Sequence, residues 1–287
     1  MKLKKQHIRL LMFIIAAAVV LIAQYAKPST TIPAAEGKLI VHYLDVGQAD
    51  CILLEQNSAA MLIDAGNNGD AELILDYLTD RGIQKLDYVV GTHPHEDHIG
   101  SLDTVIRNFE IGQLLMPKVE TNTKTFEDVL DAAINKNLTI TAPSNGDTFP
   151  LGTAVVTAVN ALEPSKKDLN NASIMLRVDF GETSFLFSGD AEAEAEEAAI
   201  RSGANLRADV LKVGHHGSRT SSSPEYLAAV KPAYAIISCG TDNDYGHPHK
   251  ETLKMYADVK LYRTDKDGHV VVECDGKNLA WHTEKER

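Results

Sequence analysis

Hydrophobic and polar positions alternate in short runs along the chain from residue 38 onward. Apolar runs with strand character, separated by Gly and Asn clusters that suit tight turns, fall at 39–46, 51–55, 60–63, 86–90, 154–159, 173–180, 183–188, 209–213 and 234–238. Apolar residues at helical spacing fall between them, at 71–81, 126–134, 191–201, 224–230 and 251–256, and two short strands follow. Strand groups mixed with helices in two similar halves predict an α/β fold of two sheets with helices outside.

The first 26 residues have a different pattern. Four basic residues precede an uncharged apolar run at 10–23, and a Pro, Thr and Ala stretch follows to Gly37. This order is typical of an export signal. The apolar run is shorter than the ~20 residues of a comfortable membrane span, and no clear A-x-A cleavage site follows it, so a cleaved signal peptide and an uncleaved membrane anchor both stay open.

We therefore divide the chain into an export segment or anchor at 1–26, a linker at 27–37 and a folded domain at 38–287. Basic residues before the span favour a cytoplasmic N-terminus. The folded domain is then expected outside a bacterial cell or on the outer face of its cytoplasmic membrane, with the membrane as a partner if the segment is retained. No protein partner is implied.

Composition is that of a globular protein, with 44% hydrophobic and 24% charged residues and a net charge of −12 at pH 7. The excess of acid argues against a broad basic surface for nucleic acid. It does not exclude a nucleic-acid substrate, because bound divalent cations would reverse the local field at one site. Cys51, Cys239 and Cys274 are widely spaced in or beside apolar runs, which predicts buried small hydrophobic side chains, with one disulfide as the alternative.

A dense set of potential metal ligands follows the strand at 86–90. His93, His95, Asp97 and His98 place three imidazoles and a carboxylate within six positions. Imidazole and carboxylate together suit zinc, manganese or iron rather than calcium. We therefore expect one or two divalent metal ions here, with zinc or manganese favoured.

This run resembles the first metal-binding motif of the metallo-β-lactamase superfamily. The resemblance implies an αββα sandwich of four layers, a mixed α/β (α+β) architecture. It also implies that His93 and His95 serve one metal, that Asp97 and His98 serve the other, and that a later Asp, matched here by Asp190, bridges both. Asp64, at the end of an earlier strand, matches an Asp that supports the loop.

Further motifs narrow the resemblance to one branch of the superfamily. These are the runs LDVGQAD at 44–50, NNAS at 170–173, LKVGHHGS at 211–218 and YGHPH at 245–249. They are similar to the hydrolase domain of the competence protein ComEC and its free-standing exported relatives. Members of that branch are thought to cut DNA or other phosphodiesters.

The chain departs from the general superfamily at one position. The superfamily places another His between the first motif and the bridging Asp, and this chain has none between His98 and His215. Asn171 occupies that neighbourhood, as in the ComEC branch, and is expected to contact substrate. At least one of His215 and His216 is expected to be a metal ligand, and the pair is a candidate to complete the first site. We assign His215 to the metal and His216 to the substrate.

Ser218 and His247 are the remaining candidates for substrate contacts. A hydroxyl beside His216 would bind a phosphate oxygen, and His247 follows the strand at 234–238 at a point where a last ligand or phosphate contact is expected. Capping of a turn is an equally good interpretation of Ser218.

Together these features predict metal-assisted hydrolysis. A divalent ion makes hydroxide available at neutral pH by lowering the pKa of bound water, and Asp97 or Asp190 is placed to accept a proton. We expect a phosphodiesterase or nuclease acting on DNA. The alternatives are hydrolysis of a small phosphocholine-type ester, a lactone or a lactam, and a surface binding module that lost its chemistry.

Overall fold

In the computed structural model, which describes residues 37–285, the predicted strands form two sheets. The first sheet has the order β15-β14-β1-β2-β3-β4-β5-β6. Its strands are β1 (Leu39–Tyr43), β2 (Ile52–Gln56), β3 (Ala59–Ile63), β4 (Lys85–Val90), β5 (Glu110–Leu115), β6 (Ile140–Thr141), β14 (Val270–Cys274) and β15 (Leu279–Thr283). Strands β3 to β6 run parallel, and the remaining pairs are antiparallel.

The second sheet has the order β13-β12-β11-β10-β9-β8-β7. Its strands are β7 (Thr148–Leu151), β8 (Ala154–Ala158), β9 (Leu176–Phe180), β10 (Thr183–Phe187), β11 (Val210–Lys212), β12 (Tyr234–Ile237) and β13 (Lys260–Arg263). The run from β10 to β13 is parallel, and β7 to β10 is antiparallel.

Side-chain alternation along the strands explains why the sheets stack. In β2, Ile52 and Leu54 face the second sheet, whereas Leu53 packs under the helices of its own side. Successive residues of a strand point to opposite faces, so a strand that is apolar throughout is buried on both sides. Phe185 and Phe187 of β10 complete the core between the sheets.

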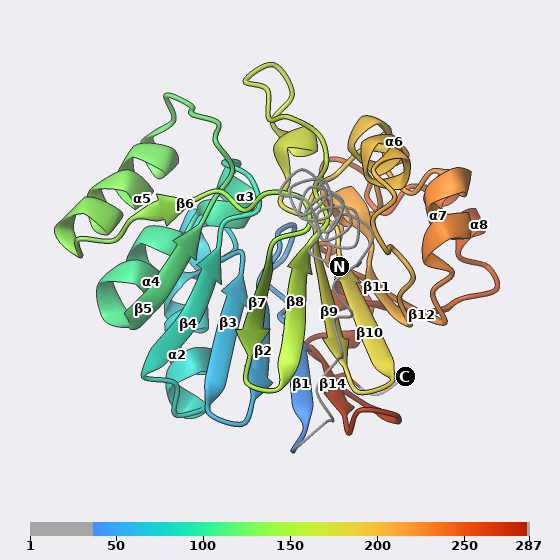
Figure 1. The fold of residues 1–287 in the computed structure, drawn as a ribbon, viewed down its shortest axis with the longest axis horizontal. Coiled ribbons are helices and arrows are strands. Elements are labelled where there is room, and N and C mark those ends of the chain that lie inside the picture. The colour runs from blue at the N-terminus through green and yellow to red at the C-terminus, as the bar shows by residue number, and fades with distance from the viewer. Residues whose placement is uncertain (1–36, 286–287) are drawn as a thin grey trace, which may run out of the picture. The chain divides into compact units, whose positions relative to one another are not determined.

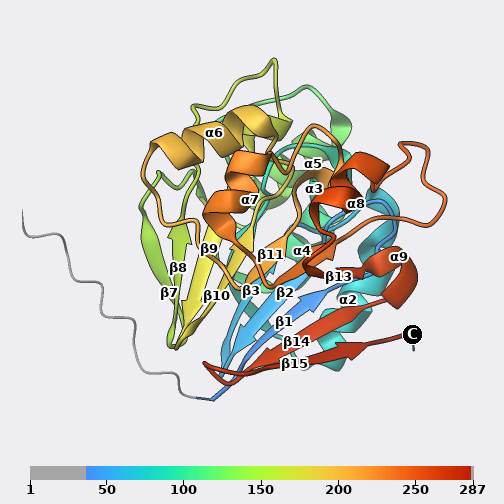
Figure 2. The same cartoon turned by 90° about the vertical axis from the view of Figure 1, so that its right-hand side faces the viewer.

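Helices cover the two outer faces (Figure 1). The first sheet is covered by α2 (Ala71–Asp80), α4 (Leu102–Asn108) and α5 (Lys124–Asn135), and the second by α6 (Ala193–Arg201), α7 (Pro224–Val230) and α8 (Lys250–Met255). Figure 2 shows α6 and α7 from the side of the second sheet. Short helices α3 (Glu96–Ile99), α9 (Thr264–Asp267), η1 (Asn68–Asp70), η2 (Asn170–Ala172) and η3 (Gly214–Gly217) lie in the connections. The predicted αββα sandwich is confirmed.

The sequence pattern missed helix α4 and strands β5 and β7, and it predicted two short strands after residue 256 where the structure has three, β13, β14 and β15. Helix α4 has only seven residues, too few for its spacing of Leu102, Val105 and Ile106 to stand out. Strand β5 is interrupted by Gly112, where a Cβ would lie 2.5 Å from the carbonyl oxygen of Asp87 on the neighbouring strand. A glycine inside a strand commonly marks such a close backbone approach.

All three cysteines are buried and free, as small hydrophobic side chains. The predicted export segment, 1–26, and residues 27–36 of the predicted linker lie outside the described part of the chain. Among residues 37–285, no helix combines the length and the apolar character needed to cross a membrane.

Candidate metal centre

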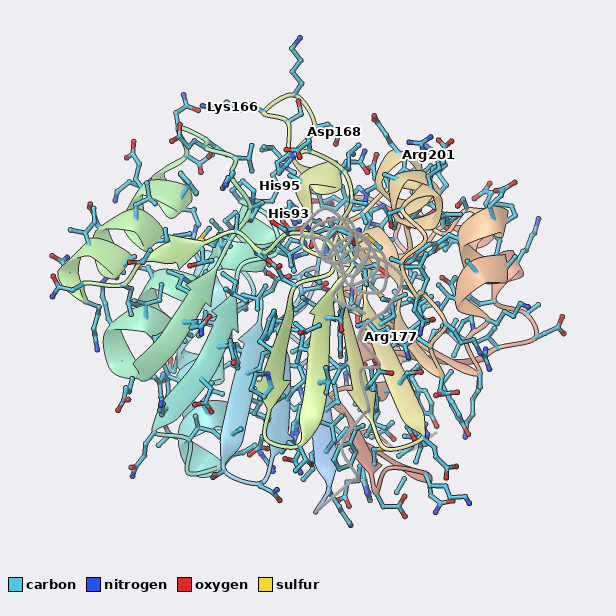
Figure 3. The ribbon with its side chains drawn as sticks, in the orientation of Figure 1. His93, His95, Lys166, Asp168, Arg177 and Arg201 are labelled. Atoms are coloured by element: carbon cyan, nitrogen blue, oxygen red, sulfur yellow. The ribbon has the colours of Figure 1, made fainter. Side chains whose placement is uncertain are left out.

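The predicted ligands lie at one edge of the sandwich, where strands of both sheets end. Asp64 follows β3 and His93 follows β4 in the first sheet, whereas Asp190 follows β10 and His215 follows β11 in the second. Carboxyl ends of parallel strands meet at the same edge, which is the usual place for a binding site in open α/β sheets. Figure 3 shows His93 and His95 above the ends of the strands.

Asp64 holds the loop that carries the first motif. Its carboxylate accepts hydrogen bonds from the Thr92 amide at 2.7 Å and the Thr92 hydroxyl at 2.8 Å. The same carboxylate lies 2.7 Å from Nδ1 of His98. This contact fixes the His98 ring so that Nε2 faces inward, the arrangement by which a carboxylate orients a ligating histidine.

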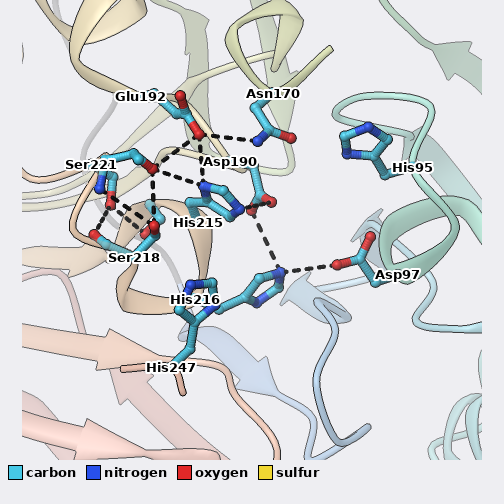
Figure 4. Close-up of polar contacts among 12 residues, drawn as sticks. His95, Asp97, Asn170, Asp190, Glu192, His215, His216, Ser218, Ser221 and His247 are labelled. Atoms are coloured by element: carbon cyan, nitrogen blue, oxygen red, sulfur yellow. Dashed lines mark hydrogen bonds and ion pairs between the residues drawn. The ribbon is translucent and has the colours of Figure 1, made fainter. Parts of the chain in front are cut away.

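One oxygen of Asp190 faces a compact group of potential ligands (Figure 4). Oδ1 lies 3.2 Å from Nε2 of His98 and 3.6 Å from Nε2 of His216. Asp97 joins this group, with Oδ2 3.3 Å from Nε2 of His216. One ligand atom from each of these four residues lies within 4.8 Å of the others.

The other oxygen of Asp190 faces a second, looser group. Oδ2 lies 3.7 Å from Nε2 of His215 and 3.9 Å from Nε2 of His93. His95 adjoins His93, with 2.9 Å between its Nδ1 and Nε2 of His93. Asp190 therefore lies between two sets of imidazoles, as a carboxylate that bridges two metal ions would.

Unsatisfied polar atoms show that the first of these groups fits a metal ion. His98 Nε2, His216 Nε2 and Asp190 Oδ1 are buried and have no hydrogen-bond partner among the described residues. These three atoms face one another at 3.2 and 3.6 Å, so a cation held between them would satisfy all three. Two imidazoles and two carboxylates form a donor set that suits zinc or another first-row transition metal.

An unusual backbone explains how two consecutive histidines reach both groups. His215 and His216 have φ values of 47° and 51°, in the left-handed region that non-glycine residues rarely adopt. Nδ1 of His216 donates to the Ser238 carbonyl at 3.0 Å, and Nδ1 of His215 donates to Glu192 at 3.0 Å. Both rings thus present Nε2 to Asp190. The sequence had assigned only His215 to the metal, whereas His216 is the more buried of the two and belongs to the tighter group.

The charges at the site compensate one another. Burial lowers the pKa of His216, but Asp190 and Asp50 outweigh it and raise that pKa to about 10. The pKa of His98 is likewise raised above its usual range, because Asp190 and Asp64 outweigh burial. Two imidazolium ions among the carboxylates of the metal-free protein thus occupy the electrostatic role that a divalent cation would take.

The site opens into a cavity of about 520 Å³. Its lining residues are Gln48, Asn67, His95, Glu96, Asp97, Asn170, His215, His216, Tyr245 and His247. His247, predicted to contact substrate, lies on this wall, where its Nδ1 is 3.2 Å from the Gln48 side chain. Burial and the neighbouring His215 lower the pKa of His247 to about 4, so the ring is neutral at pH 7.

Two other predicted substrate contacts make local hydrogen bonds. The side-chain oxygen of Asn171 accepts from the backbone amides of Glu192 and Ala195, at 3.0 and 3.2 Å, and so supports the start of α6. The Ser218 hydroxyl lies 2.9 Å from that of Thr220 and is almost fully buried. Neither side chain lines the cavity, so their contact with substrate stays a prediction.

A buried ion pair beneath the ligands went unnoticed in the sequence. Lys212 Nζ lies 2.7 Å from Oδ2 of Asp50, with both side chains essentially inaccessible to solvent. Oδ1 of Asp50 lies 3.5 Å from Nδ1 of His216. The available signal was that both residues fall within runs that resemble the ComEC branch, at 44–50 and 211–218.

An αββα sandwich with histidine and aspartate ligands at the strand ends defines a metal-dependent hydrolase of the metallo-β-lactamase type. The family model described as the metallo-beta-lactamase superfamily matches residues 44–241, and the chain belongs to that superfamily. Solved structures agree on the fold. YhfI of Bacillus subtilis aligns with a TM-score of 0.54 at 12% identity over 82% of this chain and 99% of its own. CmlA, a diiron β-hydroxylase from Streptomyces venezuelae, aligns with a TM-score of 0.52 at 15% identity, covering 82% and 54%.

Competence proteins are among the relatives in sequence. ComE operon protein 3 of Bacillus subtilis (strain 168) is 30% identical over 80% of this chain and 32% of its own length. Competence protein ComA of Neisseria gonorrhoeae is 30% identical over 81% and 32%, and Recombination protein 2 of Haemophilus influenzae is 32% identical over 75% and 26%. The chain thus spans about a third or less of the length of these relatives.

Proposed function

We propose that this hydrolase is a metal-dependent phosphodiesterase that cuts DNA. The observation that carries the proposal is Asp190, a buried carboxylate with imidazoles facing each of its oxygens, next to an open cavity that His215 and His216 line. The two ligand groups around Asp190 would each hold a divalent ion, which would supply hydroxide by lowering the pKa of bound water toward about 7 and would stabilise charge on a phosphodiester. We expect zinc or manganese.

Other residues that line the cavity would transfer a proton and bind the phosphate group. Asp97 is the carboxylate of the ligand group that is partly exposed to the cavity, so it is placed to accept a proton during attack. His247 is neutral at pH 7, so it is available to hydrogen-bond a phosphoryl oxygen. The Gln48 side chain contacts Nδ1 of His247 and so orients the imidazole ring.

DNA is favoured as the substrate by the relatives and by the motifs that the chain shares with the ComEC branch. The printed names of the relatives refer to competence and recombination. We also propose that residues 1–26 export the domain and that it works outside the cytoplasm, attached to the membrane if that segment is retained. Protection of the domain from protease added to intact cells would contradict this location.

The cavity wall supports a second candidate. Glu96 and Asp97 line the cavity, and the chain has a net charge of −12, which disfavours a polyanion where no cation is bound. A small phosphocholine-type ester carries a positive charge as well as a negative one, so the acidic wall would not repel it. A neutral lactone or lactam would not be repelled either. A binding module without chemistry is disfavoured, since Asp97, His98, Asp190 and His216 still form a group that could hold a metal ion.

The decisive experiment measures cleavage of plasmid and single-stranded DNA by the full chain with added Mn²⁺, Zn²⁺ or Mg²⁺. The double variant Asp97→Ala/His98→Ala should be inactive, and the control Asp131→Ala/His282→Ala, which changes two exposed residues, should match the wild type. Metal-loaded protein that leaves DNA intact but hydrolyses p-nitrophenyl phosphorylcholine or a chromogenic β-lactam would replace this proposal with the second candidate. Full turnover by the Asp97/His98 variant would refute the assigned site.

A further inference from the structure

One aromatic side chain at the cavity is largely exposed to solvent. Tyr245 lies in the connection between β12 and α8 and is 69% exposed. The other large apolar side chains with high exposure in the described residues are Leu73, Ile134 and Met255, and none of them lines the cavity. Tyr245 does line it, together with the ligands Asp97 and His216.

The Tyr245 ring is the last of three stacked rings, which begin at His216 and pass through His247. The rings of His216 and His247 are 6.4 Å apart and inclined by 25°, and those of His247 and Tyr245 are 5.7 Å apart and inclined by 21°. These two stacking contacts connect His216, in the buried ligand group, with the exposed ring of Tyr245.

The segment that carries these rings is held in place. The Asn243 side chain accepts from the His247 amide at 2.9 Å and donates to the carbonyls of His247 and Gly240, at 2.6 and 2.9 Å. Gln48 also spans the segment, since it accepts from the Gly240 amide at 3.1 Å and contacts His247. The ring of His247, on which Tyr245 stacks, is therefore preorganised, and binding a flat group against Tyr245 would cost little ordering of this segment.

We propose that Tyr245 is a stacking platform for a nucleobase next to the scissile phosphodiester. Every base has a π-face, so an aromatic side chain binds bases of any identity. The acidic chain offers little positive charge to follow a phosphate backbone, and stacking supplies affinity that does not depend on it. The inference rests on the proposed function, since it names the part of a phosphodiester substrate that this wall recognises.

The platform selects a class of DNA. A base within a duplex is already stacked on both faces and must be unpaired and extruded before it meets Tyr245, at a cost of a few kcal/mol. The bases of single strands and frayed ends are free to stack. The preferred substrates are therefore single-stranded DNA and strand ends.

The test compares two phosphodiesters that share a leaving group, thymidine 5′-(p-nitrophenyl phosphate) and methyl p-nitrophenyl phosphate, with the full chain and Mn²⁺. Tyr245→Ala should lower kcat/KM for the thymidine ester roughly 5- to 100-fold, the range expected for loss of one stacked base. It should leave the methyl ester unchanged. Tyr245→Phe, which keeps the ring, should behave like the wild type, as should Ile134→Ala, which removes an equally exposed side chain from α5. Equal losses on both esters, or none, would overturn the platform.

A binding measurement separates this inference from the proposed function. If neither DNA nor either ester is hydrolysed, the proposed function fails, and the platform is judged by fluorescence anisotropy of a labelled ten-residue oligothymidine. The platform predicts that Tyr245→Ala weakens the Kd by the same roughly 5- to 100-fold, and that Tyr245→Phe does not. It also predicts that an oligonucleotide lacking its bases binds wild type and Tyr245→Ala alike. Equal affinity of the Ala and Phe variants for oligothymidine would refute it.

Discussion

Replacing Lys212 by Met should destabilise the fold, because it removes the nearest counter-ion of the buried Asp50 carboxylate. At the observed 2.7 Å the attraction between the two charges is about 6 kcal/mol for an effective dielectric constant of about 20. Desolvation of both ions offsets part of this gain. Removal of one partner from a buried pair typically costs about 3–5 kcal/mol, and we expect a loss of that size in the free energy of unfolding at pH 7.

The dependence on pH identifies the cause of that loss. Burial raises the pKa of Asp50, but Lys212 and His216 outweigh it and hold that pKa at about 2 in the folded wild type. The pKa is below the unfolded value of about 3.9, so the stability that Asp50 contributes is complete above pH ~4 and is lost as the pH falls toward 2. In Lys212→Met, burial should raise the Asp50 pKa, and protonation should reduce the cost of the substitution between pH 7 and pH 4.5.

Urea unfolding followed by circular dichroism, with a chelator present, measures these free energies. Lys277→Met is the matched control, because Lys277 is exposed and lies 4.0 Å from Glu182; such surface pairs contribute about 0–1 kcal/mol. The double variant Lys212→Met/Asp50→Leu should recover much of the loss, since a pair of apolar side chains has no charge to bury. A cost below about 1 kcal/mol for Lys212→Met, or the same cost at both pH values, would refute the reasoning.

Three further outcomes follow from the site. Binding of one metal ion to the group of Asp97, His98, Asp190 and His216 at pH 7 should release about two protons, because His98 and His216 must each lose a proton to bind through Nε2. Titration calorimetry in two non-coordinating buffers measures this, and heats independent of the buffer would contradict it. Asp64→Asn should weaken metal affinity about 10- to 100-fold in competition with a chelating dye, because Asp64 orients His98; unchanged affinity would mean that the ring needs no such support. Gly189→Ala should cost about 1–2 kcal/mol of stability, because φ is 52° and the new Cβ would lie 3.0 Å from the Ser173 side chain; an unchanged urea midpoint would show that the turn relaxes.

Much of this site was predictable because its parts are local in the sequence. His93, His95, Asp97 and His98 fall within six positions after a strand, so any fold that keeps the strand brings them together. The sandwich was predictable because strands buried on both faces carry continuous apolar runs. Short elements next to the ligands, such as α4, were missed because seven residues hold too few turns for a periodicity to emerge.

The roles of His215 and His216 were not predictable from spacing, because they depend on backbone conformation. In a regular strand consecutive side chains point to opposite faces, and only one of the two would face the site. Two consecutive left-handed residues remove that alternation, and both rings face Asp190. The ion pair of Lys212 with Asp50 was not predictable for a related reason, because a buried charge has no sequence pattern of its own until its partner is known.

The candidate ligands come from both sheets, so a bound metal ion would also affect the stability of the fold. His93, His95, Asp97 and His98 belong to the first sheet and its loops, whereas Asp190, His215 and His216 follow strands of the second. In both groups around Asp190, ligands from the two sheets meet, so neither sheet holds a complete set alone. An ion bound there would join the two halves of the sandwich at its open edge, and its binding free energy would add to the stability of their association.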